Sequence, residues 1–74
     1  LYIDPKSKLQ ELMQELRGQT PLYRVLKEIG PDHNKVFTVG VYVKRELLGK
    51  GEGASKNKAQ QAAAKIALDN FERN

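Results

Sequence analysis

The sequence has no cysteine, no tryptophan and a single histidine. Without cysteine it can form no disulfide, no thioether link to haem and no zinc site built on thiolates. No apolar run approaches the roughly 18 residues of a membrane span, and the first residues do not resemble a signal peptide. We therefore expect a protein of a reducing compartment, the cytoplasm, with no membrane partner.

The chain is also short. Its 74 residues are too few for a catalytic barrel or a doubly wound nucleotide-binding sheet, so we interpret residues 1–74 as one domain, excised from a longer protein. A domain of this size buries only about 60% of the surface of its unfolded chain. Its hydrophobic core must therefore be thin.

Residues suited to catalysis are scarce. His33 has no cysteine to pair with, and the serines Ser7 and Ser55 both stand where a helix is expected to begin. The nine acidic residues are scattered singly, without the clustered carboxylates of a two-metal nuclease. The glycine-rich segment 49–53 lacks the GxxxxGK[ST] spacing of a phosphate-binding loop. We expect no catalytic residue, metal, cofactor or small-molecule ligand within these residues.

A first helix is predicted over residues 5–17. Asp4 suits the N-cap, Pro5 the first helical position and Gly18 the C-terminal stop. Apolar residues recur at intervals of three and four, as on one buried face of a helix. They are Leu9, Leu12, Met13 and Leu16.

Three strands are predicted to follow. Residues 22–29 are rich in strand formers, and residues 30–34 form a dense cluster of turn residues. Apolar and polar residues then alternate over 37–44, the strongest strand signal in the chain. A third strand is expected over about 46–50. Short links between consecutive strands indicate an antiparallel meander.

A second helix is predicted from Ser55 onward, with Ser55 as its N-cap and residues 49–54 as a flexible approach. Its small side chains would let it lie close to the sheet, with Leu68 and Phe71 filling the far end. The expected buried stripe is Ala59, Ala62, Ala63, Ile66 and Ala67. The fold class is then α+β, in the order α-β-β-β-α, with both helices on one face of a three-stranded antiparallel sheet.

Positive charge is concentrated near the second helix. Residues 44–58 carry five basic and two acidic side chains, a balance of +3 out of the total +4. Lys56 and Lys58 stand in the first helical turn, where the helix dipole is positive and cations cost about 0.3 to 1 kcal/mol each. An ordinary solvated basic face is the alternative interpretation. Because lysines at the positive end of a helix are unfavourable unless they bind a ligand, we favour an anion-binding site at this helix start.

Two segments match a known family. Residues 30–37, GPDHNKVF, resemble the GPxHxxxF segment of double-stranded RNA-binding domains, and residues 51–59, GEGASKNKA, resemble their GxGxSKKxA helix start. The runs 4–11 and 59–64 look most like the C-terminal domain of bacterial ribonuclease III. The resemblance spans about residues 4–68.

The resemblance implies three contacts with duplex RNA. The first helix would enter a minor groove, the loop after the first strand would reach the next one, and the second helix start would bind phosphates between them. Without the resemblance, the glutamines would be interpreted as an exposed helix face and the histidine as a turn residue. The implied RNA-binding residues are Ser7, Gln10, Glu11, Gln14, Pro31, His33, Ser55, Lys56 and Lys58.

The chain departs from the family where Asn57 and Gln60 replace common lysines, which suggests weaker phosphate binding.

The resemblance also implies a longer parent, with a separate magnesium-dependent nuclease domain through which the enzyme dimerises. Two alternatives stay open: another RNA-processing or regulatory host, or a protein-interaction or dimerisation module. The latter would expose an apolar patch near Leu47 and Leu48.

Overall fold

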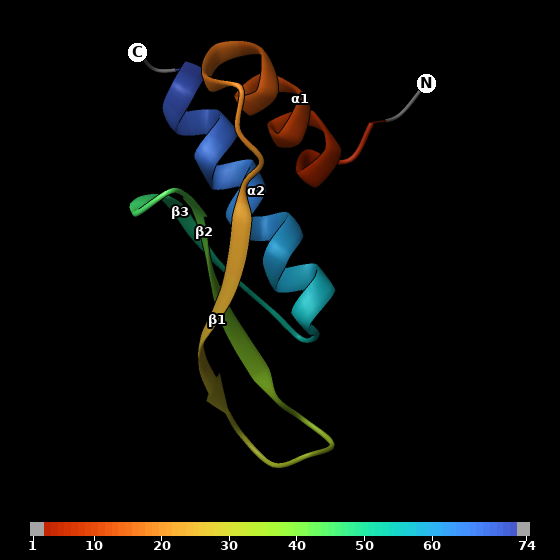
Figure 1. Ribbon diagram of the computed structural model, residues 1–74. Coiled ribbons are helices and arrows are strands. Elements are labelled where there is room, and N and C mark those ends of the chain that lie inside the picture. The colour runs from red at the N-terminus through yellow and green to blue at the C-terminus, as the bar shows by residue number, and fades with distance from the viewer. Residues whose placement is uncertain (1–2, 73–74) are drawn as a thin grey trace.

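Two helices cover one face of a three-stranded antiparallel sheet in the computed structural model, which describes residues 3–72 (Figure 1). The strand order is β1-β2-β3, as expected of a meander. The predicted α+β class and the order α-β-β-β-α are confirmed. The elements are α1 (Pro5–Arg17), β1 (Leu22–Ile29), β2 (Val36–Val43), β3 (Glu46–Gly53) and α2 (Lys56–Glu72).

Local signals set both ends of α1, as predicted. The Asp4 side chain accepts a hydrogen bond from the Ser7 backbone at 2.8 Å, and Pro5 is the first helical residue. Gly18 ends the helix in the left-handed conformation, with φ of 64°. Leu16, the last residue of the predicted apolar stripe, is 59% exposed and borders a hollow between α1 and the end of α2.

The capping carboxylate makes stability depend on pH. The hydrogen bond from the Ser7 backbone holds the pKa of Asp4 below its ordinary value of 3.8. A lowered folded-state pKa stabilises the fold above the unfolded pKa, and this contribution is lost as pH falls through the folded pKa. We expect Asp4→Ala to lower the melting temperature at pH 7 and to lose most of this effect well below pH 3.8. Thermal melts of both proteins at pH 7 and well below pH 3.8 test this. A difference in melting temperature between wild type and variant that is the same at both pH values would contradict it.

The third strand is longer than predicted. The expected end near Lys50 and the flexible approach over 49–54 are wrong, because β3 continues to Gly53. Gly49, Gly51 and Gly53 face α2, whose backbone lies so close that a Cβ on any of the three would collide with it. A Cβ on Gly49 would lie 2.8 Å from the Ala63 carbonyl oxygen. These glycines allow close packing of the helix on the sheet and are not a hinge.

The buried face of α2 is rotated relative to the predicted stripe. Ala64, outside that stripe, is buried, whereas Ile66 is 42% exposed and Ala62 is only partly buried. The reason is that α1 packs against α2 on the side of Leu68 and Phe71. Ala59, Ala63 and Ala67 are buried as predicted.

The core lies between the sheet and the two helices. The inward positions of β2 are buried valines, as their alternation predicts, and α1 contributes Leu9 and Met13. A register shift after Val41 adds one residue to β3, so Leu48 turns inward and is 7% exposed. Leu47 lies on the other face and is 44% exposed. The two leucines therefore do not form the shared patch that an interaction module would expose.

Candidate nucleic-acid interface

The exposed face of α1 is polar and carries all four of the side chains proposed for the first contact. They lie three and four residues apart, so they follow one another along the helix surface. The Gln14 amide donates a 2.7 Å hydrogen bond to the Thr20 hydroxyl, which holds this side chain against the turn before β1. The face is lined by Ser7, Gln10, Glu11, Gln14 and Glu15, all exposed.

The start of α2 has the chemistry of an anion site. The Ser55 hydroxyl accepts a 3.1 Å hydrogen bond from the Lys58 backbone, so Ser55 is the predicted N-cap. Among residues 3–72, no partner is found for the backbone N–H groups of Lys56 and Asn57. The first turn holds no acidic residue, and the side chains of Lys56 and Lys58 are exposed. Helix dipole, free N–H groups and ammonium groups therefore all favour an anion.

The loop between β1 and β2 has a defined shape. Gly30 has φ of 105°, and the Asn34 backbone donates a 2.8 Å hydrogen bond to the Pro31 carbonyl. Pro31 and His33 are exposed on this turn. The loop therefore already has a defined conformation in which these two residues are exposed to a ligand.

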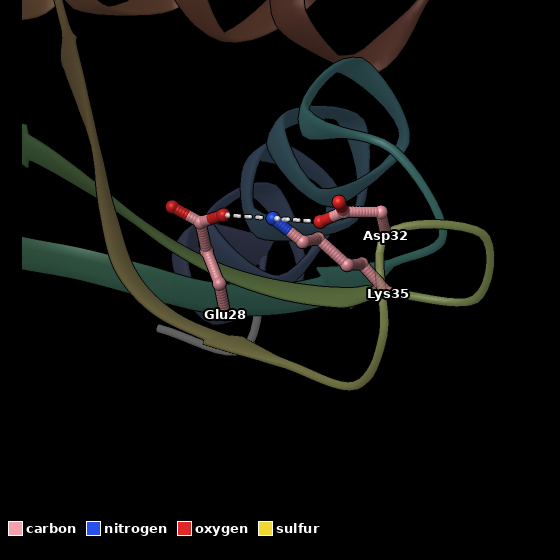
Figure 2. Close-up of polar contacts among 3 residues, drawn as sticks. All are labelled: Glu28, Asp32 and Lys35. Carbon is pink, nitrogen blue, oxygen red and sulfur yellow. Dashed lines mark hydrogen bonds and ion pairs between the residues drawn. The ribbon is translucent and has the colours of Figure 1, made fainter.

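One lysine ties this loop to the sheet. The Lys35 ammonium lies 3.3 Å from the Glu28 carboxylate at the end of β1 and 3.6 Å from Asp32 in the loop (Figure 2). The sequence interpretation missed Lys35. The i, i+3 spacing from Asp32 was a visible signal, but the contact with Glu28 depends on the pairing of β1 with β2.

The fold brings two of the three proposed contacts together. Ser7 and Gln10 of α1 line one polar pocket with Asn57 of α2. The β1–β2 loop is separate, since among residues 3–72 no hydrogen bond or ion pair joins Pro31 or His33 to either helix. In the view of Figure 1, α1, the first turn of α2 and the β1–β2 loop follow one another down the right-hand side of a molecule 40 Å long.

The pocket between the helices contains residues that sequence patterns did not reveal. Burial, and then the charge of Asp4, raise the pKa of Tyr23 to about 12. Its hydroxyl is buried and has no partner among the described residues. Lys6, Gln60 and Gln61 connect the two helices here. Each of these contacts joins residues far apart in the chain, so no local pattern could reveal them.

Other kinds of site are not found in the described part of the chain. Residues 3–72 contain no group of three or more histidine and acidic side chains placed to hold a metal ion. Neither of the helices within that range combines the length and the apolar content needed to cross a lipid bilayer.

Comparison with known proteins shows what this arrangement resembles. The chain is 52% identical over 67 residues to Ribonuclease 3 of Protochlamydia amoebophila and 50% identical over 71 residues to Ribonuclease 3 of Syntrophomonas wolfei. These matches cover 90% and 95% of this chain but only 28% and 30% of those enzymes. The chain thus spans less than a third of the length of these relatives.

Solved structures share the fold. A structure of Arabidopsis HYL1 matches with a TM-score of 0.79 and 30% identity, covering 92% of this chain and 96% of that one. Dicer from Pichia stipitis matches with a TM-score of 0.70 and 29% identity, over 88% of this chain and 31% of that one. The family model of the double-stranded RNA binding motif matches residues 5–71, nearly the whole chain. The chain belongs to the double-stranded RNA binding motif family.

Proposed function

We propose that this domain binds duplex RNA by shape, with little dependence on base sequence, through three contacts. Side chains of α1 enter one minor groove, the β1–β2 loop enters the next, and the start of α2 binds phosphates across the major groove between them. The deep major groove of A-form RNA is closed to side chains, which leaves its phosphates to be recognised. The residues proposed for these contacts are Ser7, Gln10, Glu11, Gln14, Pro31, His33, Ser55, Lys56 and Lys58.

The adjacency of two unlike surfaces carries this proposal. The polar, hydrogen-bonding face of α1 and the cationic start of α2 border one pocket, which Ser7 and Gln10 line from α1 and Asn57 lines from α2. Gln10 can donate and accept hydrogen bonds, and the Glu11 carboxylate can accept from a ribose 2′-hydroxyl. That hydroxyl is the group that distinguishes RNA from DNA. A minor groove bordered by a row of phosphates requires this combination.

The similarity to Ribonuclease 3 supports a proposal about the parent protein. We infer that the domain presents duplex RNA to a separate endonuclease domain in RNA processing. That domain would supply the magnesium ions for phosphodiester hydrolysis and the contacts for homodimerisation. The parent is proposed to act in the cytoplasm. The chain matches only 28% and 30% of the length of the two Ribonuclease 3 proteins named above, so the remaining length of such a protein is sufficient for a nuclease domain.

Direct binding measurements test the RNA proposal. We expect a duplex RNA of about 16 base pairs or more to bind well above a B-form DNA duplex of the same sequence. The logarithm of the association constant should fall linearly with the logarithm of the salt concentration, because phosphate binding releases counterions. Fluorescence anisotropy at several salt concentrations measures both quantities.

Two control ligands sharpen this test. A second RNA duplex of equal length and unrelated sequence should bind with similar affinity, because the shape of the helix is recognised. A single strand of the same RNA should bind more weakly. Equal affinity for the RNA and DNA duplexes would refute the proposed function.

A further inference from the structure

Side chains in the second turn of α2 bind the first turn of α1. The Lys6 backbone N–H donates a 3.2 Å hydrogen bond to the Gln61 side-chain oxygen. The Lys6 ammonium donates a 2.6 Å hydrogen bond to the Gln60 side-chain oxygen. A helix N-terminus leaves its first N–H groups without partners inside the helix. Here a side chain of α2 satisfies one of these groups at the start of α1.

The Lys6 side chain is held at more than one point. Its ammonium lies 5.1 Å from the centre of the Tyr23 ring, within the range of a cation–π contact, and Lys6 is partly buried. Burial and an aromatic neighbour restrict a side chain that would otherwise sample many rotamers. The link between α1 and α2 is therefore a defined connection, and its Lys6 also contacts Tyr23 of β1.

This link lies between two of the proposed RNA contacts. The pocket that Lys6 lines has Ser7 and Gln10 on the α1 side and Asn57 on the α2 side. Lys6 directly precedes Ser7, while Gln60 lies one helical turn after Lys56. A change in the angle between the helices would move the α1 side chains relative to the phosphate-binding turn.

We propose that Lys6, through Gln60 and Gln61, is a positioning residue that holds the α1 side chains at the spacing from the α2 start that duplex RNA requires. This inference rests on the proposed function. The grooves of a duplex have fixed spacing, so a domain with the two surfaces already aligned loses less conformational freedom on binding. Gln60, at a position where the family often carries lysine, acts here as the acceptor for another lysine.

A double-mutant cycle tests this inference. Lys6→Met removes the ammonium but keeps the stem, and Gln60→Met removes the acceptor at similar length. We expect each variant to bind a 16-base-pair RNA about three- to tenfold more weakly. The double variant should bind no more weakly than the weaker single variant, because both changes break the same link. The salt dependence should stay as in the wild type, because no phosphate contact is lost.

Controls separate positioning from charge and from folding. Lys8→Met removes the same charge from α1, at a residue whose side chain has no hydrogen bond to α2 among residues 3–72, and should change the affinity less than twofold. Binding is measured well below the melting temperature of each variant, which keeps the loss of affinity distinct from loss of fold.

The other outcomes overturn the inference. Losses that multiply in the double variant would show two independent contributions. A salt slope that falls by about one in Lys6→Met alone would show a direct phosphate contact. Unchanged affinity in both single variants would remove any role for the link. A wild-type chain that fails to bind RNA would refute the proposed function as well, whereas the three preceding results leave that function intact.

Discussion

Gly51→Ala is expected to destabilise the domain by about 3 kcal/mol or more, although it adds only a methyl group. The new Cβ would collide with the backbone nitrogen of Ala63 and the side chain of Ala62, both on α2. Backbone atoms cannot move away by a change of rotamer, as a flexible side chain can. The helix and the strand would therefore have to separate. A chain of this length has a total stability of roughly 4 to 11 kcal/mol. The substitution would therefore remove much of it.

The same substitution at Gly40 is the matched control. Gly40 lies in the middle of β2, and the three atoms nearest to a Cβ there belong to the side chains of Leu26, Tyr42 and Leu47, at 3.0 to 3.1 Å. These side chains can shift, so Gly40→Ala should cost less than about 1 kcal/mol. Thermal melts measure the contrast: a shift of about 12 °C or more for Gly51→Ala against a few degrees for Gly40→Ala. Equal shifts would contradict the close-packing interpretation of β3.

The error over β3 shows where local sequence information ends. Locally, residues 49–53 contain three glycines and two charged residues, a composition typical of loops. The glycines are required because α2 occupies the space that their side chains would fill. The need for them arises from an element that begins only at Lys56. The alanines of α2 indicated a close approach to the sheet, but nothing in the pattern identified the strand that it approaches.

Local signals predicted α1 and β2 much better. The bounds of α1 follow from Asp4, Pro5 and Gly18, all of which act on backbone groups within a few residues. Alternation placed Val39, Val41 and Val43 on the buried face, because strand periodicity decides which face each residue occupies. Ile66 was predicted to be buried and is exposed, because the helix periodicity of α2 could not reveal where α1 packs.

The candidate site also contains features that local sequence predicts and features that depend on distant parts of the chain. The polar face of α1 and the cationic start of α2 were visible because each lies within one helix. The link from Lys6 to Gln60 and Gln61 joins residues 54 and 55 positions apart, and Tyr23 meets it from a third element. The family resemblance then allowed the residues proposed to contact RNA to be named from the sequence. The residues that hold those contacts in place could not.

Lys56→Ala is expected to weaken RNA binding and to stabilise the free domain. Lys56 stands at the positive end of α2 with no acidic residue in the first turn. Removing its charge should relieve about 0.3 to 1 kcal/mol of unfavourable interaction with the helix dipole. Loss of one phosphate contact should lower the affinity about tenfold for every RNA duplex and reduce the salt slope by about one. A variant that is more stable but binds RNA more weakly would show that Lys56 is present to bind a ligand and not to stabilise the fold.

Lys65→Ala provides the comparison on the same helix. Lys65 is exposed and lies 3.8 Å from Asp69, well beyond the first turn of α2. Its loss removes the same charge from the domain, so it should leave the salt slope unchanged and lower the affinity only slightly. Thermal melts and anisotropy titrations at four or more salt concentrations compare the two variants. Equal losses of affinity and slope would mean that RNA responds to the total charge of the domain, and Lys56 would then have no specific place in the site.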